Sequence, residues 1–414
     1  MFNILVINCH TDNRGDESAV HALVDEINIR TEGDCRIVLS MRGVGRYPNM
    51  PPNVTCISQY IPSSTKGIIS NRLATITRGK LVLSKNEALM VNEITKADFI
   101  VHAPGGPSIG DTYLDAEKTY LRIFDLILGM KKKYMFYAPS MGPFNNAQRN
   151  KWRMRILNNA EAIVVRDPIS AQYLKSLGLK KEVFQALDSA LQSDINIEQN
   201  QIKLSKYNDL SQFLARYKRC IGITITDLKW HPVLSKDVNI GMAIKSSFER
   251  FLVYLKENGY GIIFIPQLYG TGNDYDLMEA YGKNLENSFI LQSNNNDYDA
   301  YFQQYLISQL YAVVGMRYHS NIFSAKMETP FISVSYEQKM EGFMQKIGLS
   351  DYCIKVQDLR DDLLINKFIA LCENYDDLKV FLKKKHSIMR QESKRTSDIL
   401  FDVLNREGLV NNCD

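Results

Sequence analysis

Short apolar runs alternate with helix-length segments along most of this 414-residue chain. The clearest example is the apolar run at residues 312–315, which is followed by a helix-length interval at 320–326 and a second apolar run at 331–335. A buried strand, a helix and another buried strand explain this spacing. Repeated units of this kind place parallel strands in one sheet with helices on its faces, so the alternation predicts an α/β fold.

The alternation occurs twice. In the first half we expect strands at residues 2–8, 36–39, 99–102, 134–138, 162–165 and 182–185. In the second half we expect them at 220–225, 261–266, 312–315 and 331–335, with a helix at 248–258. A polar interval at 194–218 predicts a linker and the entry into a second domain.

We therefore predict two Rossmann-like domains that face a central cleft, an arrangement similar to that of the GT-B glycosyltransferases. The expected boundaries are residues 1–195 for the first domain and 215–362 for the second. A helical pattern at residues 363–414 ends the chain and could cross back to brace the first domain.

Composition excludes several classes of protein. The 50 basic and 46 acidic residues give a net charge of +4, which predicts no nucleic-acid partner. Residues 1–6 enter a strand pattern without the basic leader of a signal peptide, and no apolar run reaches the length of about 18 residues that a membrane span needs. We therefore expect a cytoplasmic protein.

The cysteines and histidines suggest no metal or disulfide chemistry. Seven cysteines are scattered without C-x-x-C spacing, at positions 9, 35, 56, 220, 353, 372 and 413. We expect buried thiols rather than disulfides, and no cluster of His, Cys and carboxylates predicts a metal site. For His10, His21, His102 and His231 we expect ordinary core or surface positions.

Arg317 and His319 directly follow the apolar run at 312–315. In open parallel sheets ligands bind beyond the carboxyl ends of the strands, which is where these two side chains should lie. Arginine is a forked anion binder, and histidine exchanges protons near neutral pH. The alternative is that Arg317 pairs with a nearby acid and His319 caps the following helix.

The loop after the first predicted strand also has functional potential. Asn13, Gly15 and Asp16 stand in this loop, and we expect Asp16 to cap the helix that follows while Gly15 permits a tight turn. A helix N-terminus offers backbone N–H groups to an anion or a sugar hydroxyl. A plain capped turn explains the same residues equally well.

Two further loops follow later strands of the first half. Gly105 and Gly106 would allow a ligand to approach the backbone closely, although a surface turn would also use them. Arg166 ends the strand at 162–165, with Asp167 as the expected cap of the next helix. An ion pair between Arg166 and Asp188 is the alternative to ligand binding.

Together these loops resemble the polysaccharide pyruvyl transferases. Residues 315–325, GMRYHSNIFSA, followed by TPFISVSYEQK at 329–339, resemble the family pattern G-x-R-x-H-x-x-I-x-A with a later P and Y-x-x-K. The loop at 13–17 resembles its G-N-x-G-D-E, and residues 104–111 resemble its G-G-G-x-x-x-D with Pro104 in place of the first glycine. Residues 138–143 retain only the final Gly-Pro of G-Q-G-I-G-P, while 166–170 and 188–190 resemble R-[DE]-x-x-S and D-x-A.

The resemblance implies transfer of pyruvate from phosphoenolpyruvate to two sugar hydroxyls as a cyclic ketal. It implies that Arg166, Arg317, Lys339 and Tyr336 bind the donor and that His319 supplies the proton, because a phosphorylated carboxylate needs forked cations and its enol carbon needs an acid. It needs no metal and no cofactor besides phosphoenolpyruvate as co-substrate. The expected acceptor or loop contacts are Asn13, Gly15, Asp16, Gly105, Gly106, Asp111 and Asp188.

The implied acceptor is a polysaccharide precursor or lipid-linked oligosaccharide, which would make the enzyme peripheral at the inner face of the membrane. The basic residues 383–385 could touch anionic lipid, although a solvated helix face explains them better. Two other functions remain open. A nucleotide-sugar-dependent GT-B glycosyltransferase would use Arg317 and Lys339 on a diphosphate and Glu337 or Glu341 on a ribose. A non-catalytic glycan-binding or assembly protein would explain the prolines at 104 and 139.

Overall fold

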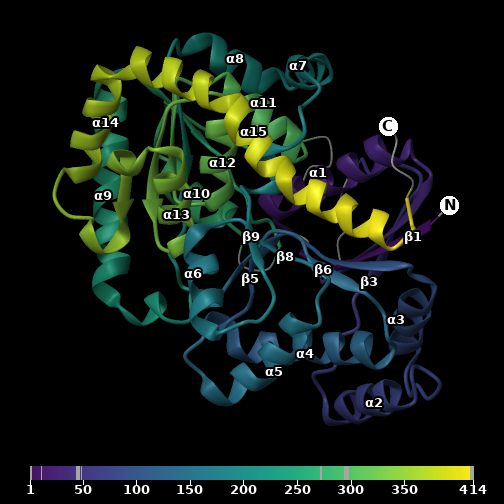
Figure 1. Cartoon of the computed structure of the whole chain (residues 1–414). Coiled ribbons are helices and arrows are strands. Elements are labelled where there is room, and N and C mark those ends of the chain that lie inside the picture. Colours follow the sequence, from purple (N-terminus) through teal and green to yellow (C-terminus); the bar gives the residue numbers. More distant parts are fainter. Residues whose placement is uncertain are drawn as a thin grey trace. The chain divides into compact units, whose positions relative to one another are not determined.

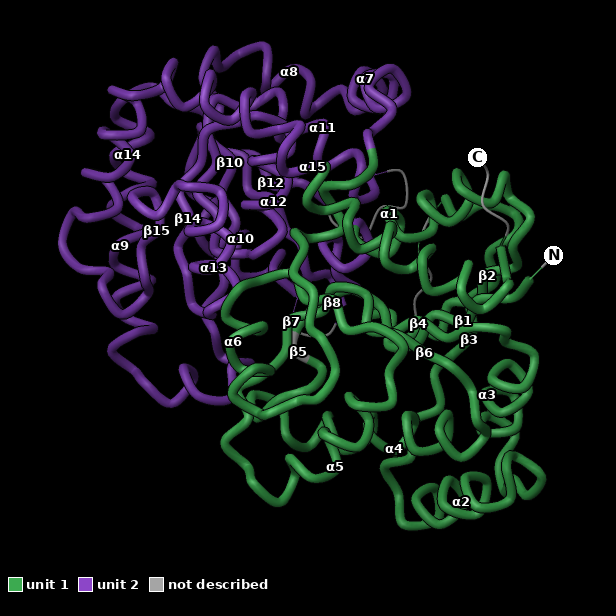
Figure 2. Tube along the Cα trace, in the orientation of Figure 1, with its two compact units in different colours: residues 1–11, 19–193, 391–414 green, residues 12–18, 194–390 purple. Residues whose placement is uncertain are grey.

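In the computed structural model, the described residues are 2–10, 12–42, 47, 49–270, 273–292 and 298–410. The chain forms two compact units (Figure 2). Unit 1 contains residues 1–11, 19–193 and 391–414, and unit 2 contains residues 12–18 and 194–390. The short segment 12–18, which follows the first strand, thus belongs with the second half of the chain.

Unit 1 is built on a parallel sheet. Within the described residues its strands have the order β3-β2-β1-β4-β6-β8-β9, and every neighbouring pair is parallel. A separate parallel pair, β5 and β7, extends from the loops after β4 and β6. The strands are β1 (Phe2–Cys9), β2 (Cys35–Met41), β3 (Val54–Ser58), β4 (Phe99–His102), β5 (Gly105–Ile109), β6 (Tyr134–Phe136), β7 (Pro139–Met141), β8 (Ile163–Val165) and β9 (Val183–Gln185).

Helices cover both faces of this sheet, because its strands are apolar on both sides (Figure 1). One core contains Leu23 of α1 and Leu404 of α15, and the other contains Phe124 of α4 and Leu174 of α6. The end of the chain therefore packs on the sheet of unit 1. The helices are α1 (Arg14–Thr31), α2 (Thr65–Ile76), α3 (Lys85–Lys96), α4 (Leu114–Gly129), α5 (Ala147–Asn158), α6 (Pro168–Leu177) and the last part of α15 (Tyr375–Arg406).

Unit 2 repeats the architecture. Its described strands have the order β12-β11-β10-β13-β14-β15, again with every pair parallel. They are β10 (Cys220–Thr224), β11 (Gly261–Phe264), β12 (Ser288–Ile290), β13 (Ala312–Gly315), β14 (Phe331–Ser335) and β15 (Cys353–Lys355). The helices are α7 (Ile197–Lys206), α8 (Asn208–Arg216), α9 (Val238–Glu257), α10 (Tyr275–Gly282), α11 (Ala300–Ser308), α12 (Tyr318–Lys326), α13 (Gln338–Ile347) and α14 (Leu363–Glu373).

The α/β class with two parallel sheets is confirmed, and several local expectations are corrected. The polar interval at 194–218 is not an extended linker, because it forms helices α7 and α8. Helix α9 begins ten residues before the expected start at 248, since Asp237 caps it through the backbone N–H of Asn239. Asn13 rather than Asp16 caps α1: its Oδ1 accepts the N–H of Gly15 at 2.8 Å.

The cysteines fit the expectation of free thiols. Six described cysteines are thiols outside any disulfide, with Cys9, Cys35 and Cys220 buried and the other three half-buried. Burial raises the pKa of Cys35 and of Cys220 to about 12, so these thiols stay protonated. Cys413 lies outside the described residues. None of the described helices is long and apolar enough to cross a membrane.

Candidate active site

The predicted Arg317 motif lies in unit 2 where the strand order reverses, between β10 and β13. In sheets of this type, that reversal opens the crevice in which ligands bind. Arg317 follows β13 and stands at the N-cap of α12, and its backbone N–H donates to Thr224 Oγ1 at the end of β10 at 3.2 Å. The Ser320 hydroxyl lies 2.8 Å from the same oxygen and donates to the Arg317 carbonyl at 2.6 Å. These bonds fix the backbone of the motif.

The Arg317 guanidinium is held by Asp274, at the start of α10. Arg317 Nε donates to Asp274 Oδ2 at 3.1 Å, and Nη2 donates to Oδ1. Asp274 Oδ2 also accepts the backbone N–H groups of Gln267 and Leu268 at 3.0 Å each. The structure therefore shows the ion pair that was the alternative for Arg317. Because Asp274 engages only two of the five guanidinium N–H groups, it fixes the side chain and leaves part of its donor capacity.

Aromatic side chains surround this guanidinium. It lies 5.5 Å from the ring centroid of Trp230, whose Nε1 donates to Thr226 Oγ1 at 3.1 Å, and the Trp230 and Tyr336 rings meet edge to face at 5.7 Å. Burial opposes the charge of Arg317, but Asp274 and Tyr336 outweigh it and raise the Arg317 pKa. The guanidinium is therefore permanently charged in a largely buried place.

Lys339 lies in the first turn of α13, where it is paired with the carboxylate of Glu337. Its Nζ is 2.6 Å from Glu337 Oε2 and 5.8 Å from the ring centroid of Tyr318. Burial raises the pKa of Tyr336, against the opposing effects of Lys339 and Arg317. The Tyr336 hydroxyl is therefore neutral near pH 7 and is available as a hydrogen-bond donor.

His231 also belongs to this cluster, although the sequence predicted only a core or surface histidine. Its Nδ1 accepts the backbone N–H groups of Val233 and Leu234 at 3.2 and 3.0 Å, so a proton on the neutral ring sits at Nε2. Nε2 lies 3.8 Å from Glu337 Oε1, and the ring is 6.2 Å from that of Tyr336. Burial lowers the His231 pKa, with Glu337 opposing and Lys339 adding to the effect.

His319 is buried in the first turn of α12 and touches the loop after β1. A Cβ atom at position 15 would lie 1.9 Å from His319 Nδ1 and 2.2 Å from its Cγ, so the Gly15 backbone packs directly on the imidazole. The ring also meets Tyr318 edge to face at 5.0 Å. Two sequence motifs that are 300 residues apart thus form one surface within unit 2.

Further contacts hold residues 13–18, which comprise Asn13 and the first residues of α1, on unit 2. Asn13 forms an antiparallel bridge with Leu268, and the Arg14 N–H donates to the Gln267 carbonyl at 2.9 Å. The carboxylate of Glu17 is fully buried and accepts from Arg14 Nη1 at 2.7 Å and from the backbone N–H of Ala300 at 2.9 Å. This segment is therefore anchored at the end of β11 and at the start of α11.

The remaining predicted residues lie in unit 1. Arg166 is buried, with Nε donating to Ser140 Oγ at 3.0 Å and Nη1 donating to Asp188 Oδ2 at 2.5 Å. The other Asp188 oxygen accepts the N–H of Ala190 at 2.9 Å. The Arg166–Asp188 ion pair named as an alternative is thus present, and it orients the guanidinium.

The two glycine-containing loops of unit 1 pack against one another through β5 and β7. A Cβ atom at Gly110, whose φ is +150°, would lie 2.5 Å from the Gly142 carbonyl oxygen. Asp111 Oδ1 accepts from Arg153 at 2.8 Å, and Arg153 Nε donates to Glu117 Oε1 at 2.7 Å. This buried network holds the turn that follows Gly105 and Gly106, so Asp111 has a structural role whatever else it contacts.

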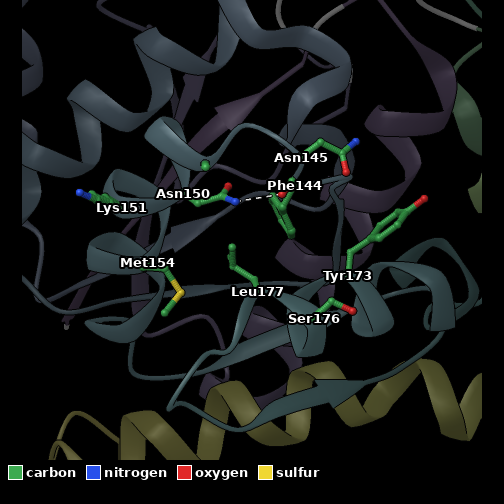
Figure 3. A pocket seen from close by; sticks show the side chains of 9 residues that line it. Phe144, Asn145, Asn150, Lys151, Met154, Tyr173, Ser176 and Leu177 are labelled. Carbon is green, nitrogen blue, oxygen red and sulfur yellow. Dashed lines mark hydrogen bonds between the residues drawn. The ribbon is translucent and has the colours of Figure 1, made fainter.

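A hollow of about 600 Å³ lies beside this turn (Figure 3). Asn150 Nδ2 donates to the Phe144 carbonyl at 2.9 Å across its floor, and Tyr173 stands at one side. Lys151 is the basic residue among its described lining residues. A single lysine does not supply the paired cations that a phosphorylated carboxylate needs, so we do not assign the donor to this hollow.

His102 has the core role that the sequence predicted. Its Nδ1 is 2.7 Å from the Ala103 carbonyl oxygen and its Nε2 is 2.8 Å from Ser108 Oγ. Burial, as the largest cause, lowers the His102 pKa to about 4. The ring is therefore neutral and bridges the end of β4 to β5. No group of three or more His, Cys, Asp and Glu suited to a metal occurs among the described residues.

Comparison with known proteins places these motifs in one family. Residues 13–338, more than half of the chain, match the polysaccharide pyruvyl transferase family. The chain belongs to this family. It is also 22% identical over 443 aligned residues to the amylovoran biosynthesis protein AmsJ of Erwinia amylovora, covering 98% of this chain and 100% of that protein.

Solved structures show the same fold at low sequence identity. A UDP-N-acetylglucosamine 2-epimerase of Rickettsia bellii is 11% identical, with a TM-score of 0.53 over 98% of this chain and 98% of that one. The S. aureus MnaA–UDP co-structure is also 11% identical, with a TM-score of 0.57 over 99% and 98% of the two chains. At these identities the likeness shows the fold alone, and it confirms the GT-B-like class.

The predicted residues of this pyruvyl transferase family member thus form two groups. Unit 2 brings His319, Arg317, Tyr336 and Lys339 together with the loop of Gly15, while unit 1 holds Arg166, Asp188 and the loops of residues 105–111. Sequence reasoning missed four members of the unit 2 cluster, which are Trp230, His231, Asp274 and Glu337 as the partner of Lys339. The Tyr336–Lys339 motif already included Glu337, whereas Asp274 and Trp230 lie in loops with no matching pattern.

Proposed function

We propose that this protein transfers pyruvate from phosphoenolpyruvate to two hydroxyls of one sugar and so forms a cyclic ketal. The observation that carries the proposal is the unit 2 cluster, in which the buried Arg317 is fixed by Asp274 beside Tyr336 and Lys339, two residues before His319. Such a cluster combines the two requirements of this reaction, which are a preorganised anion site and an adjacent acid.

The donor would bind at the start of α12. Phosphoenolpyruvate carries a phosphate and a carboxylate, and forked N–H groups recognise both. The part of the Arg317 guanidinium that Asp274 does not engage, the Lys339 ammonium and the N-terminus of α12 would share these anions. Gln267 adds a candidate donor, because its Nε2 is buried and has no hydrogen-bond partner among the described residues.

The proposed reaction needs one proton transfer to carbon, two attacks at the neighbouring carbon and the loss of a proton from each sugar hydroxyl. His319 gives a proton to the methylene carbon of the enol, which becomes the methyl group, and positive charge develops at the carbon bearing the phosphate ester. One sugar hydroxyl adds to that carbon, and its proton restores the protonated His319. The C–O bond to phosphate then breaks, the second hydroxyl attacks the same carbon and closes the ketal ring, and its proton leaves on the inorganic phosphate. Arg317 and Lys339 stabilise the departing phosphate.

The acceptor would be a precursor of an exopolysaccharide. The relative AmsJ is by its name a protein of amylovoran biosynthesis, which supports this assignment. A sugar chain built on a lipid carrier would place the enzyme in the cytoplasm, at the inner face of the membrane. Asp188 and the loops of residues 105–111 in unit 1 are the proposed acceptor contacts, and Arg166 is proposed as a second arginine for the donor.

The nucleotide-sugar alternative requires a carboxylate for the ribose. Both candidates are instead paired with a lysine, Glu337 with Lys339 at 2.6 Å and Glu341 with Lys355 at 2.8 Å. That engagement favours the pyruvyl donor.

The test is turnover with isotopically labelled phosphoenolpyruvate and a panel of lipid-linked sugars. The proposal predicts release of inorganic phosphate together with a new ketal methyl signal in NMR spectra of the product. His319→Ala should lower the rate about 10²- to 10⁴-fold, the usual contribution of a general acid. Acceptor binding without turnover, unchanged in His319→Ala, would instead identify a non-catalytic glycan-binding protein.

A further inference from the structure

Residues 35–86 carry a strong charge asymmetry. This 52-residue stretch contains no Asp or Glu, whereas the whole chain has nearly equal numbers of acids and bases. It contains eight basic residues, Arg36, Arg42, Arg46, Lys66, Arg72, Arg78, Lys80 and Lys85. The last five lie on α2, on the loop after it and at the start of α3, and all five are exposed.

Helix α2 exposes two of its four large apolar side chains, while Ile68 and Leu73 are half-buried. Its buried residues are Ser70, Asn71 and Ala74, while Ile69 and Ile76 are exposed, Ile76 to 80%. Helices of water-soluble domains normally bury the large apolar residues. Small residues fill the buried side of α2 because α4 approaches closely: a Cβ atom at Gly129 would lie 2.6 Å from the Thr75 carbonyl oxygen.

The loop after α2 adds to the same surface. The Leu83 N–H donates to Ser70 Oγ at 3.0 Å, and the Leu81 N–H donates to Thr77 Oγ1 at 3.1 Å, so the loop folds back along the helix. Leu81 and Leu83 are half-exposed, and Leu89 follows on α3. We call this the α2–α3 surface, with apolar members Ile69, Ile76, Leu81, Leu83 and Leu89 and basic members Lys66, Arg72, Arg78, Lys80 and Lys85.

The cations of the α2–α3 surface are not neutralised. Among the described residues, none of the five forms an ion pair, and Glu87, the acid nearest in sequence, is fully buried against Ser70. Burial is the largest cause that lowers the pKa of Arg122, and the positive charges of Arg72 and Arg149 lower it further. Figure 2 shows α2 at the edge of unit 1, beyond α4.

We propose that the α2–α3 surface docks on an anionic lipid bilayer. Helices that lie in a membrane interface expose aliphatic side chains and unpaired cations together. The aliphatic side chains insert among the lipid chains, and the cations contact the headgroups. The charge complementarity selects this partner over a second copy of the chain, because two surfaces that each carry five cations repel one another. The proposal is independent of the donor and of the chemistry.

The basic residues 383–385 that the sequence suggested for lipid contact are a poorer surface. Nearby cations of α15 have acid partners, with Arg390 Nη1 at 2.8 Å from Asp194 and Lys394 Nζ at 2.8 Å from Glu26. Lys385 lies 5.5 Å from the Phe381 ring centroid. Lys383 and Lys384 remain exposed and therefore provide a matched control.

The test is flotation of the full chain with vesicles of phosphatidylglycerol and phosphatidylcholine, compared with vesicles of phosphatidylcholine alone. Wild type should float with the anionic vesicles and dissociate at high salt. Removing two cations in Arg78→Gln/Lys80→Gln should weaken binding about 30-fold, at about 1 kcal/mol per cation. The control Lys383→Gln/Lys384→Gln removes the same charge and should bind like wild type.

A second pair of variants tests insertion apart from charge. Ile76→Ser/Leu83→Ser keeps every cation and should weaken binding about tenfold or more, whereas the equally exposed Ile29→Ser/Ile388→Ser should not. Thermal melts should match wild type, since all four positions are exposed. Absence of flotation in wild type, or equal losses in test and control pairs, would overturn the proposal. Concentration-dependent self-association abolished by Ile76→Ser/Leu83→Ser, without flotation, would assign the surface to a second copy.

Discussion

Replacing Gly15 by alanine tests whether the first turn of α1 positions the proposed acid His319. The three heavy atoms nearest to the added Cβ would be Nδ1, Cγ and Cβ of His319, at 1.9, 2.2 and 2.5 Å. Real Cβ atoms do not approach other heavy atoms so closely, so the imidazole or this turn must move. Gly15 lies within helix α1 and its φ is not positive, so the backbone itself accepts alanine.

Two opposing terms set the expected change in stability. Overpacking a filled site costs about 1–3 kcal/mol, and alanine in place of glycine in a helix returns up to about 1 kcal/mol. We therefore expect a small net loss in the free energy of unfolding. The loss of activity should be much larger, about 10²- to 10⁴-fold in kcat, because a displaced His319 no longer reaches the enol carbon.

The assay combines turnover with urea unfolding. Gly241→Ala is the matched control, because Gly241 lies in helix α9 and a Cβ atom there would meet nothing within 4 Å. That control should keep wild-type kcat and should gain up to about 1 kcal/mol in stability. In a His319→Gly background, which removes all three clashing atoms, Gly15→Ala should no longer destabilise the protein.

Two results would contradict this reasoning about Gly15 and His319. Wild-type kcat in Gly15→Ala would mean that the first turn of α1 does not position His319 for catalysis. An equal loss of stability from Gly15→Ala with and without the His319 side chain would show that the two residues are not coupled.

Three further predictions rest on individual contacts. Asp274→Asn should leave the buried Arg317 charge uncompensated, so it should lower the free energy of unfolding in urea by about 3–5 kcal/mol and weaken donor binding. The control Asp276→Asn, on the exposed side of α10, should change neither quantity. Asp188→Asn should likewise destabilise unit 1 and lower turnover, because Arg166 loses its orienting carboxylate; turnover like that of wild type would remove Arg166 from the proposed mechanism. Burial lowers the pKa of His102 to about 4, so the folded chain binds this proton more weakly than the unfolded chain does. A contribution of about 3 kcal/mol to the free energy of unfolding is therefore present above pH 6.5 and lost as the pH falls towards about 4. Thermal melts of His102→Gln across that range should show a shallower decline in stability than wild type, and identical declines would contradict the reasoning.

The sequence predicted most strands of both sheets because buried parallel strands are nearly continuous apolar runs. β1, β4, β13 and β14 were predicted to within one residue at each end. Edge strands such as β12, which is half-buried, were missed, since their side chains alternate less clearly. The polar segment 194–218 was misread from its polar composition, because α7 and α8 are short helices that fully bury only Asn200 and Leu210.

The candidate site was predictable where a motif is contiguous. Arg317, His319, Tyr336 and Lys339 stand within 23 residues of one another, on two successive strand-to-helix connections. The partners that fix them come from distant loops: Asp274 and Trp230 lie 43 and 87 residues away from Arg317. The contact of Gly15 with His319 could not be predicted either, because membership of residues 12–18 in unit 2 is a property of the folded chain.

Donor binding tests the central claim most directly. Phosphoenolpyruvate, and separately a set of UDP-sugars, should be titrated calorimetrically into wild type, Arg317→Ala and the exposed control Arg250→Ala. We predict binding of phosphoenolpyruvate to wild type and to the control, its loss in Arg317→Ala, and no response to the nucleotides. Binding of a UDP-sugar without binding of phosphoenolpyruvate would contradict pyruvyl transfer and identify the unit 2 cluster as a nucleotide-sugar site.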